Sequence, residues 1–183
     1  MFKMRKEIFK EIKIPDEVEV SLKGNLLTVK GEKGELKREF KKDKLVFEIK
    51  DGKIIVGNKK STKKEKKMIN TNIAHIKNMI RGVKEGFEYK LKSVFSHFPF
   101  TIEIKDNTAI IKNFLGEKVP RKVNLPKGVE IKINGQDIII NSIDKELAGQ
   151  AAANLETITK IKNRDRRIFQ DGIFMISKAG KEI

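Results

Sequence analysis

Apolar and polar residues alternate along residues 19–36 (EVSLKGNLLTVKGEKGEL), and the pattern returns 82 positions later in residues 101–118 (TIEIKDNTAIIKNFLGEK). Alternation with a period of two predicts strands that bury one face. Turn-forming pairs, Gly24-Asn25 in the first copy and Asp106-Asn107 in the second, interrupt each run. Each copy therefore predicts a hairpin of two antiparallel strands.

A second hairpin pattern repeats at a shift of 84 positions. Residues 46–56 (VFEIKDGKIIV) lie over residues 130–140 (EIKINGQDIII), with Asp51-Gly52 or Asn134-Gly135 between two apolar runs. Both pairs tolerate the positive φ that tight two-residue turns require. This second hairpin also occurs once in each half of the chain.

A helix follows each second hairpin, and the shift returns to 82. Thr62 and Glu65 have the spacing of a capping box, and Asp144 is the expected N-cap of the second helix. The first helix has an apolar stripe at spacings of four, three and four residues, formed by Ile69, Ile73, Ile76 and Ile80. The second stripe contains Ala151, Leu155 and Ile158.

Three repeated segments in one order predict an α+β fold of two tandem duplicated domains. Each domain is expected to be a small antiparallel sheet with one main helix packed on a face. We place the N-terminal repeat at residues 1–82 and the C-terminal repeat at residues 83–183. In the junction IRGVKEGF, Gly82 and Gly86 are expected to end the first helix and start a new strand.

The net charge of the chain indicates which class of partner it binds. The chain has 41 Lys+Arg against 25 Asp+Glu, a net charge of +16, which favours a polyanion such as nucleic acid. A solubilising lysine surface is the plainer alternative. Cys is 0, so disulfides and thiolate metal sites are excluded. With no secretory signal and no apolar run that would span a membrane, we expect a soluble intracellular protein.

The sequence contains no pattern that indicates catalysis. It has no P-loop, no G-x-G-x-x-G and no G-x-S-x-G, and its acidic residues are scattered among lysines. His75 is expected to pack beside the apolar side of the first helix, whereas His97 either stacks on a base or is a turn residue before Pro99. We therefore expect no enzyme activity, no cofactor and no metal.

Two segments concentrate the positive charge. The first is the lysine-rich segment KKSTKKEKK, residues 59–67, at a predicted helix N-terminus where backbone N–H groups can also bind an anion. A solvated loop accounts for this lysine-rich segment equally well. Its lysines are Lys59, Lys60, Lys63, Lys64, Lys66 and Lys67. Three of the seven arginines lie at residues 164–167, near Phe169 and Phe174. Arginines among aromatics on an irregular connection favour folded RNA, unless they only pair with Asp165 and Asp171.

The chain resembles the archaeal form of ribosomal protein number six of the large subunit, over essentially its whole length. The most specific stretches are VKGEKGELKREF (residues 29–40), GVKEGFEYKL (82–91), VFSHFP (94–99) and TKIKNRDRRIFQDGIF (159–174). The resemblance implies two duplicated α+β domains and no catalytic residues. It implies binding of large-subunit (23S-type) rRNA near the base of the lateral stalk and the sarcin–ricin loop, in the cytoplasmic ribosome.

The resemblance also implies a site in a basic tail of about residues 159–183. Its matching positions for RNA contact are Lys160, Lys162, Arg164, Arg166, Arg167, Gln170 and Gly172. Phe169 and Lys178 lie in the same tail and complete the candidate site. The expected partners are large-subunit rRNA, neighbouring proteins of that subunit and translational GTPases that dock nearby. The alternatives are an RNA-modifying enzyme and a peripheral protein of anionic membranes, bound through the basic segment at residues 3–13.

Overall fold

The computed structural model describes residues 6–40, 45–50 and 52–183. The chain divides into two compact units, residues 1–86 (unit 1) and residues 87–183 (unit 2). Each unit contains antiparallel sheets and one α-helix, which confirms the predicted α+β class. The division follows Gly86, whereas the sequence placed it after Gly82.

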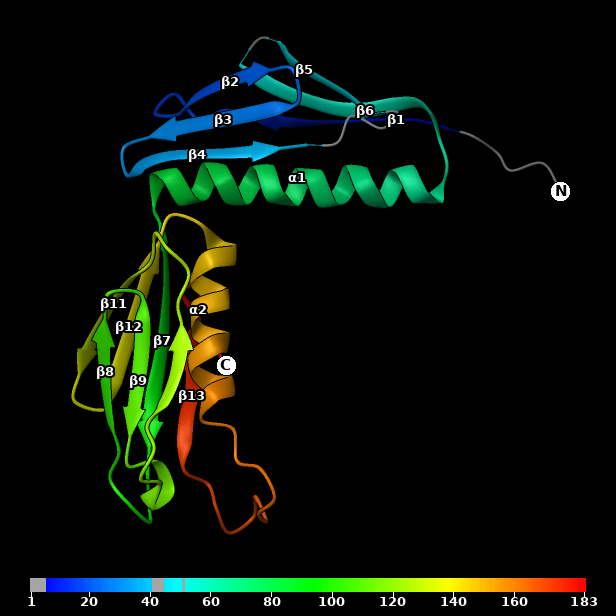
Figure 1. Ribbon diagram of the computed structural model, residues 1–183. Coiled ribbons are helices and arrows are strands. Elements are labelled where there is room, and N and C mark those ends of the chain that lie inside the picture. The colour runs from blue at the N-terminus through cyan, green and yellow to red at the C-terminus, as the bar shows by residue number, and fades with distance from the viewer. Residues whose placement is uncertain (1–5, 41–44, 51) are drawn as a thin grey trace, which may run out of the picture. The chain divides into compact units, whose positions relative to one another are not determined.

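Unit 1 has two antiparallel sheets of three strands in its described part, where the sequence predicted one (Figure 1). The strand orders are β1-β6-β5 and β2-β3-β4, and α1 (Lys63–Lys84) packs on strands of both sheets. The strands are β1 (Lys6–Lys13), β2 (Glu19–Lys23), β3 (Leu26–Gly31), β4 (Gly34–Glu39), β5 (Val46–Lys50) and β6 (Lys53–Ser61). Hairpin signals are local, so they do not say which hairpins share a sheet.

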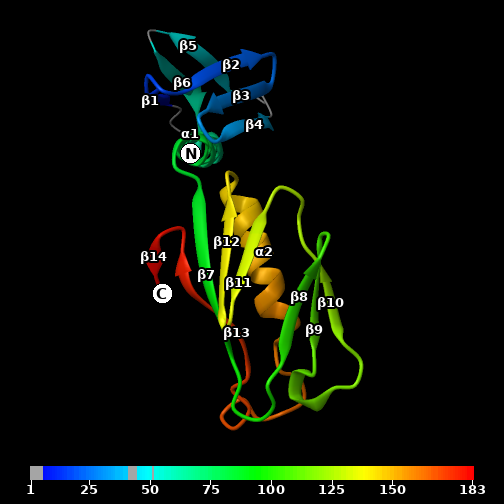
Figure 2. The ribbon, with the colours of Figure 1, turned by 90° about the vertical axis from the view of Figure 1, so that its left-hand side faces the viewer.

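Unit 2 also has two antiparallel sheets in the part of the chain described (Figure 2). One has the order β10-β9-β8 and the other β11-β12-β7-β13-β14. The helix α2 (Lys145–Ile158) packs on β7, β12 and β13 of the larger sheet and on β10 of the smaller one. The elements are β7 (Phe87–Val94), β8 (Thr101–Lys105), β9 (Thr108–Lys112), the 3-10 turn Phe114–Gly116, β10 (Arg121–Asn124), β11 (Glu130–Asn134), β12 (Asp137–Ser142), β13 (Gly172–Lys178) and β14 (Lys181–Glu182).

The element bounds reproduce the sequence repeat. β2 and β8 begin at residues 19 and 101, β5 and β11 at residues 46 and 130, and the helices at residues 63 and 145. The predicted hairpins and helices are therefore confirmed, although Asp51 of the predicted Asp51-Gly52 turn lies outside the described residues. β13 and β14 follow the second helix and have no counterpart among the described residues of unit 1. The predicted basic tail therefore consists of an irregular segment, residues 159–171, followed by two strands of the larger sheet.

The first helix begins as predicted and ends later than predicted. The Thr62 side chain accepts a hydrogen bond from the backbone, and the Glu65 carboxylate accepts one from the Thr62 N–H at 2.8 Å, which completes the capping box. Gly82 does not end the helix, because it is buried on α1 beside the fully buried Val83. Gly86, with φ 76°, follows the C-cap Glu85 and ends the helix in the left-handed conformation that glycine favours.

Each unit has its own core. In unit 1 the predicted stripe of Ile69, Ile73, Ile76 and Ile80 is buried against the strands. In unit 2 Ala151 and Leu155 are fully buried beneath α2, together with Tyr89 and Phe114. These cores hold the ends of the helices in place, and the candidate site is built on the C-terminal end of α2.

Candidate RNA interface

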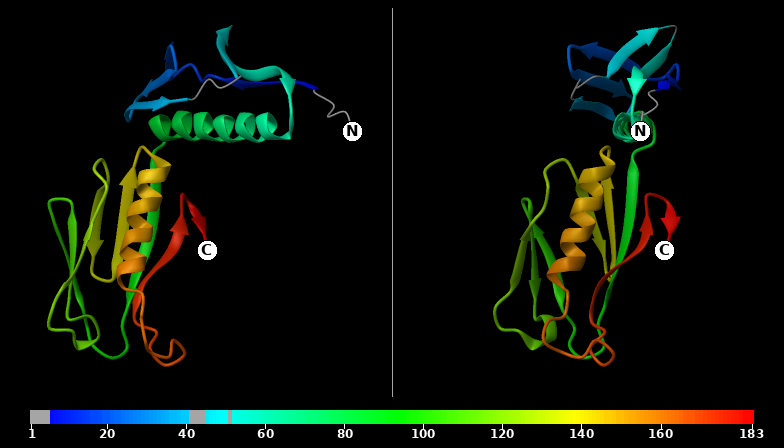
Figure 3. Two further views of the ribbon diagram at one scale, coloured as in Figure 1. Left: turned by 45° about the vertical axis from the view of Figure 1, so that its right-hand side comes forward. Right: turned by 90° about the vertical axis from the view of Figure 1, so that its right-hand side faces the viewer.

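The arginine-rich stretch is an irregular segment, residues 159–171, that leaves α2 and returns to the sheet as β13 beside β7 (Figure 3). The buried hydroxyl of Thr159 joins its two ends. The Oγ1 atom donates to the Glu156 carbonyl at 3.1 Å and accepts from the Ile173 N–H at 3.0 Å. The segment is therefore fixed where it starts and where it ends.

A buried carboxylate ties this segment to a distant loop. Asp171, whose side chain is 1% exposed, accepts hydrogen bonds from the backbone N–H groups of Ser96 at 2.7 Å and His97 at 3.1 Å. Its Oδ2 lies 2.6 Å from His97 Nδ1. Burial alone would raise the pKa of Asp171, but these hydrogen bonds outweigh it and hold the pKa below its ordinary value. The Arg–Asp171 pair that the sequence left open as an alternative does not form among the described residues, because Ser96 and His97 already donate to the carboxylate.

Phe169 is occupied by contacts within the protein. The His97 ring stacks on it with centroids 4.8 Å apart, and the guanidinium carbon of Arg164 lies 4.8 Å from its centroid. His97 lies in a bend, which agrees with the turn interpretation, and its packing on Phe169 takes up one of its faces. Phe169 and Arg164 therefore shape the segment rather than standing free in solvent.

The cationic side chains of the segment differ in whether they already make hydrogen bonds or ion pairs within the protein. Arg167, with a side chain 90% exposed, pairs with both carboxylate oxygens of Asp165, and this contact lowers the pKa of Asp165 and raises that of Arg167. One of the two Arg–Asp pairs considered from the sequence is thus present. Lys160, Lys162 and Arg166 are exposed, and within the described residues their side chains make no hydrogen bond or ion pair.

The remaining predicted positions divide into two groups. Gln170 is exposed and donates to the Arg167 carbonyl at 3.2 Å, so it belongs to the same surface. Gly172 is buried at the start of β13. Lys178 is exposed at the other end of β13, about 20 Å along the strand from Gly172 at the usual rise per residue. The structure therefore brings together residues 160–170 and leaves Lys178 apart.

Arg121 is a supporting residue that the sequence analysis did not identify. It donates to the Ile158 carbonyl at 2.7 Å, pairs with Glu117 and lies over the Phe114 ring at 4.4 Å. Hydrogen bonds from Arg121 lower the pKa of Glu117 despite its partial burial. Arg121 thereby binds a carbonyl at the end of α2, where the irregular segment begins. No sequence motif predicts this contact, because Arg121 and Ile158 lie 37 residues apart.

The lysine-rich patch of unit 1 lies where the sequence placed it. Lys59 and Lys60 end β6, and the other four lysines lie in the first turns of α1. All six are exposed, and their side chains make no hydrogen bond or ion pair among the described residues. The capping box already satisfies the Lys64 N–H and the Thr62 N–H, which leaves the lysine side chains as the main attraction for an anion.

Two other classes of site were considered. Within the described ranges, no three His, Cys, Asp or Glu residues gather as metal ligands. In the same residues, no helix has the length and apolar character needed to cross a membrane. The basic N-terminal segment considered for membrane binding is a strand over residues 6–13, paired with β6, and residues 1–5 lie outside the described part.

Comparison with known proteins agrees with the duplicated fold. The family described as "Ribosomal protein L6" matches residues 14–86 and residues 98–172. The chain is 45% identical over 174 residues to "Large ribosomal subunit protein uL6" of Methanococcus vannielii, covering 95% of this chain and 96% of the relative. It is 44% identical over 176 residues to the protein of the same name from Methanosarcina mazei, covering 96% of this chain and 100% of the relative. The chain therefore belongs to the ribosomal protein L6 family, whose members are structural, non-enzymatic proteins of the large ribosomal subunit.

Proposed function

We propose that this chain binds large-subunit rRNA chiefly through residues 160–170 of unit 2, near the base of the lateral stalk and the sarcin–ricin loop. The family resemblance supports the proposed location, and the exposed cations of the segment support the choice of surface. The observation that carries the proposal is that Lys160, Lys162 and Arg166 stand exposed and unpaired on a segment that Asp171 and Thr159 hold fixed.

Two kinds of basic residue contribute differently. Lysines spread over the surface attract RNA through counterion release, which makes binding weaker as salt rises. The segment at residues 160–170 then fixes the register, because its ends are anchored and little of the chain must be ordered on binding. The fixed Arg167, already paired with Asp165, presents its remaining guanidinium donors to a phosphate oxygen.

The lysine patch of unit 1 has a separate role in this proposal. Its six exposed lysines face solvent on a unit whose described residues contain no counterpart of β13. We assign the patch to translational GTPases that approach the assembled subunit, rather than to the main rRNA contact. Chemical labelling of lysines in assembled subunits tests this assignment. Labelling at Lys59–Lys67 is expected, and full protection there contradicts it.

The main proposal is tested by binding of the full chain to deproteinised large-subunit rRNA. Lys162→Ala and Arg166→Ala remove uncommitted cations of the segment, and Arg167→Ala removes a paired one. Lys132→Ala is the matched control, because Lys132 is exposed in the same unit on β11. We expect each segment variant to weaken binding by about 5-fold or more with an unchanged thermal midpoint. Equal effects of Lys162→Ala and Lys132→Ala would mean that only total charge matters.

Association with the subunit gives an independent test. Native extract is separated on a sucrose gradient before and after a high-salt wash, and the protein is followed by blotting. Co-migration with the large subunit through moderate salt is expected for an integral ribosomal protein. A protein that stays at the top of the gradient would contradict the proposal, and the family fold would then serve another task.

A further inference from the structure

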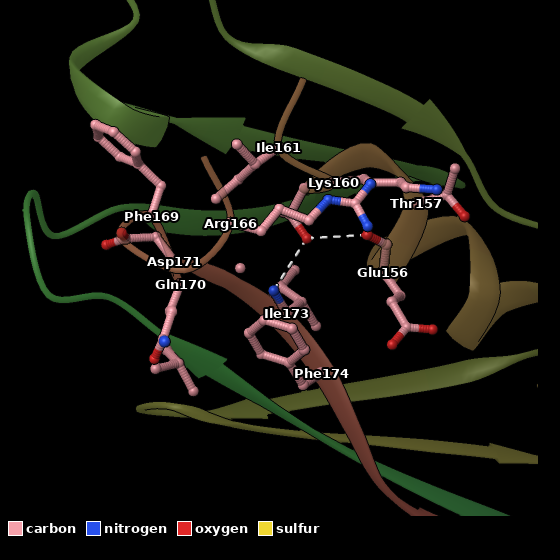
Figure 4. A pocket seen from close by; sticks show the side chains of 13 residues that line it. Glu156, Thr157, Lys160, Ile161, Arg166, Phe169, Gln170, Asp171, Ile173 and Phe174 are labelled. Carbon is pink, nitrogen blue, oxygen red and sulfur yellow. Dashed lines mark hydrogen bonds between the residues drawn. The ribbon is translucent and has the colours of Figure 1, made fainter. Parts of the chain in front are cut away.

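A cavity of about 740 Å³ lies where the irregular segment meets β13 (Figure 4). Its volume falls within the range of about 300–1,000 Å³ that small-ligand pockets occupy. The C-terminal end of α2, the segment itself, the first residues of β13 and Val94 at the end of β7 line it. It is therefore bordered by the same residues that the proposed function assigns to rRNA.

One side of the cavity is apolar and open to solvent. Phe174 is 45% exposed and Val94 is 40% exposed, although both belong to strands of the larger sheet. A group of exposed apolar side chains in a hollow often indicates a binding site, whereas single exposed apolar side chains do not. The Phe174 ring is not stacked on another ring among the described residues, in contrast to Phe169. A planar apolar group can therefore lie on Phe174.

The other side of the cavity is polar. Lys160, Arg166 and Gln170 line it together with two acidic residues, Glu156 and Asp171. The Asp171 carboxylate already accepts hydrogen bonds from Ser96 and His97. Figure 4 shows the Arg166 side chain and the Phe174 ring on two sides of the hollow, with the Thr159–Ile173 hydrogen bond between them. Arg166 makes no hydrogen bond or ion pair with the described residues, so its guanidinium is available to an anion.

Gly172 lies beside the Phe174 ring at the edge of this cavity. A Cβ atom at this position would lie 3.3 Å from the Phe174 ring and 3.6 Å from the Thr159 hydroxyl. The backbone of Gly172 has no positive φ, so its conformation does not demand glycine. The absence of a side chain here lets the Phe174 ring lie close to the backbone at the edge of the cavity.

We propose that this cavity receives one unpaired base of the bound rRNA, stacked on Phe174 with its phosphate held by Arg166 and Lys160. The inference rests on the proposed function and names the part of the RNA that the site takes. An unstacked nucleotide combines apolar ring faces, a polar edge and a phosphate, which match the apolar side, Gln170 and the two cations. Single-stranded loops and bulges supply such bases to aromatic side chains.

The first test is ultraviolet crosslinking of native large subunits, which contain the unmodified chain. Trypsin releases Phe174 within the peptide of residues 168–178, between Arg167 and Lys178. A nucleotide attached to Phe174 is expected. Crosslinks confined to other peptides of this chain would place the RNA elsewhere and overturn the base pocket.

The second test separates stacking from charge. Phe174→Ala is expected to weaken rRNA binding about 5-fold or more, whereas Phe174→Tyr keeps the ring and the affinity. The slope of log affinity against log salt concentration is expected to stay unchanged in Phe174→Ala. Arg166→Ala is expected to make this negative slope shallower by about 0.7–0.9, because one phosphate contact is lost. Phe98→Ala is the matched control, because Phe98 is 52% exposed in the same unit and does not line the cavity.

The outcomes distinguish this inference from the function on which it rests. If Lys162→Ala and Arg166→Ala weaken binding and Phe174→Ala does not, the base pocket is wrong and the rRNA-binding segment stands. If none of the three variants changes affinity, both proposals fall. Saturable binding of adenosine or uridine monophosphate without RNA would also overturn the inference, because the cavity would then serve a free nucleotide.

Discussion

The buried carboxylate of Asp171 allows a quantitative test of how the RNA-binding segment is held. Asp171→Ala removes the acceptor for the Ser96 N–H, the His97 N–H and the His97 ring. A buried donor that loses its partner costs about 1–3 kcal/mol. Two backbone donors are affected, and both belong to exposed residues that water reaches, so we expect a loss of about 2–3 kcal/mol from unit 2.

The thermal midpoint and its pH dependence follow from this loss. For a unit of this size, each kcal/mol lowers the midpoint by about 4–8 °C, so Asp171→Ala is expected to lower it by about 8–24 °C. The pKa of Asp171 is lower in the folded chain than its ordinary value. The charged carboxylate therefore stabilises the fold above the unfolded pKa of about 3.9, and this stabilisation is lost as pH falls through the folded pKa.

The assay is thermal unfolding of the full chain, followed by circular dichroism at neutral and acidic pH. Asp171→Asn keeps the shape of the side chain and removes its charge, so its deficit against the wild type is expected to shrink below about pH 4. Asp165→Asn is the matched control, since its carboxylate is exposed and pairs with Arg167 on the same surface. Equal losses in both variants, or a deficit at Asp171 that persists at low pH, would refute the anchoring role.

Three further predictions test other parts of the fold. Thr62→Ala removes the N-cap of α1 and is expected to cost about 1 kcal/mol in urea denaturation, with Thr62→Ser close to the wild type. Tyr89 is the single tyrosine, and burial raises its pKa, so phenolate absorbance should appear at higher pH in the folded chain than in the chain unfolded in guanidinium. The neutral Tyr89 phenol stabilises the fold below about pH 10, and this stabilisation is lost as pH rises through the folded pKa. Arg121→Lys loses the forked contact with Glu117 and the hydrogen bond to Ile158, and is expected to destabilise unit 2 by about 1–3 kcal/mol in the same denaturation assay.

The elements of this fold were predictable because their signals are local. Hairpins at 19–31 and 101–112, and helices that begin at Lys63 and Lys145, follow from alternation, turn pairs and caps within a few residues. Their grouping into two sheets per unit was not predictable, because it depends on edges that meet only in three dimensions. The end of α1 was also missed, since packing of Val83 carries the helix past Gly82.

The candidate site shows the same division. The cluster of cations at residues 160–167 is visible in the sequence, and so is an aspartate near enough to pair with Arg167. The contacts that hold the segment in place, by contrast, join residues far apart in the sequence. His97 and Asp171 are 74 residues apart, and Arg121 and Ile158 are 37 apart, so no periodicity or motif connects them.

The duplication separates what the two units share from what each adds. Both units keep the same order of hairpins and one helix, because those elements form each core. Their cations lie at opposite ends of the repeated helix. In unit 1 the lysine patch surrounds the N-terminus of α1. The helix α2 instead has Asp144 as its N-cap and begins with Lys145 and Glu146, and its cation-rich segment follows its C-terminus.

Among the described residues only unit 2 has a strand such as β13, and that strand supports the different roles proposed for the two units. By pairing with β7 it returns the chain to the sheet, and Thr159 and Asp171 then fix the segment between α2 and β13. A fixed segment loses little conformational freedom when it binds, so its cations are effective at a single place on the RNA. Unit 1 has exposed lysines without such a frame among its described residues, which suits it to general attraction. The proposed function therefore predicts that specific contact with rRNA depends on an addition to the repeated plan rather than on the plan itself.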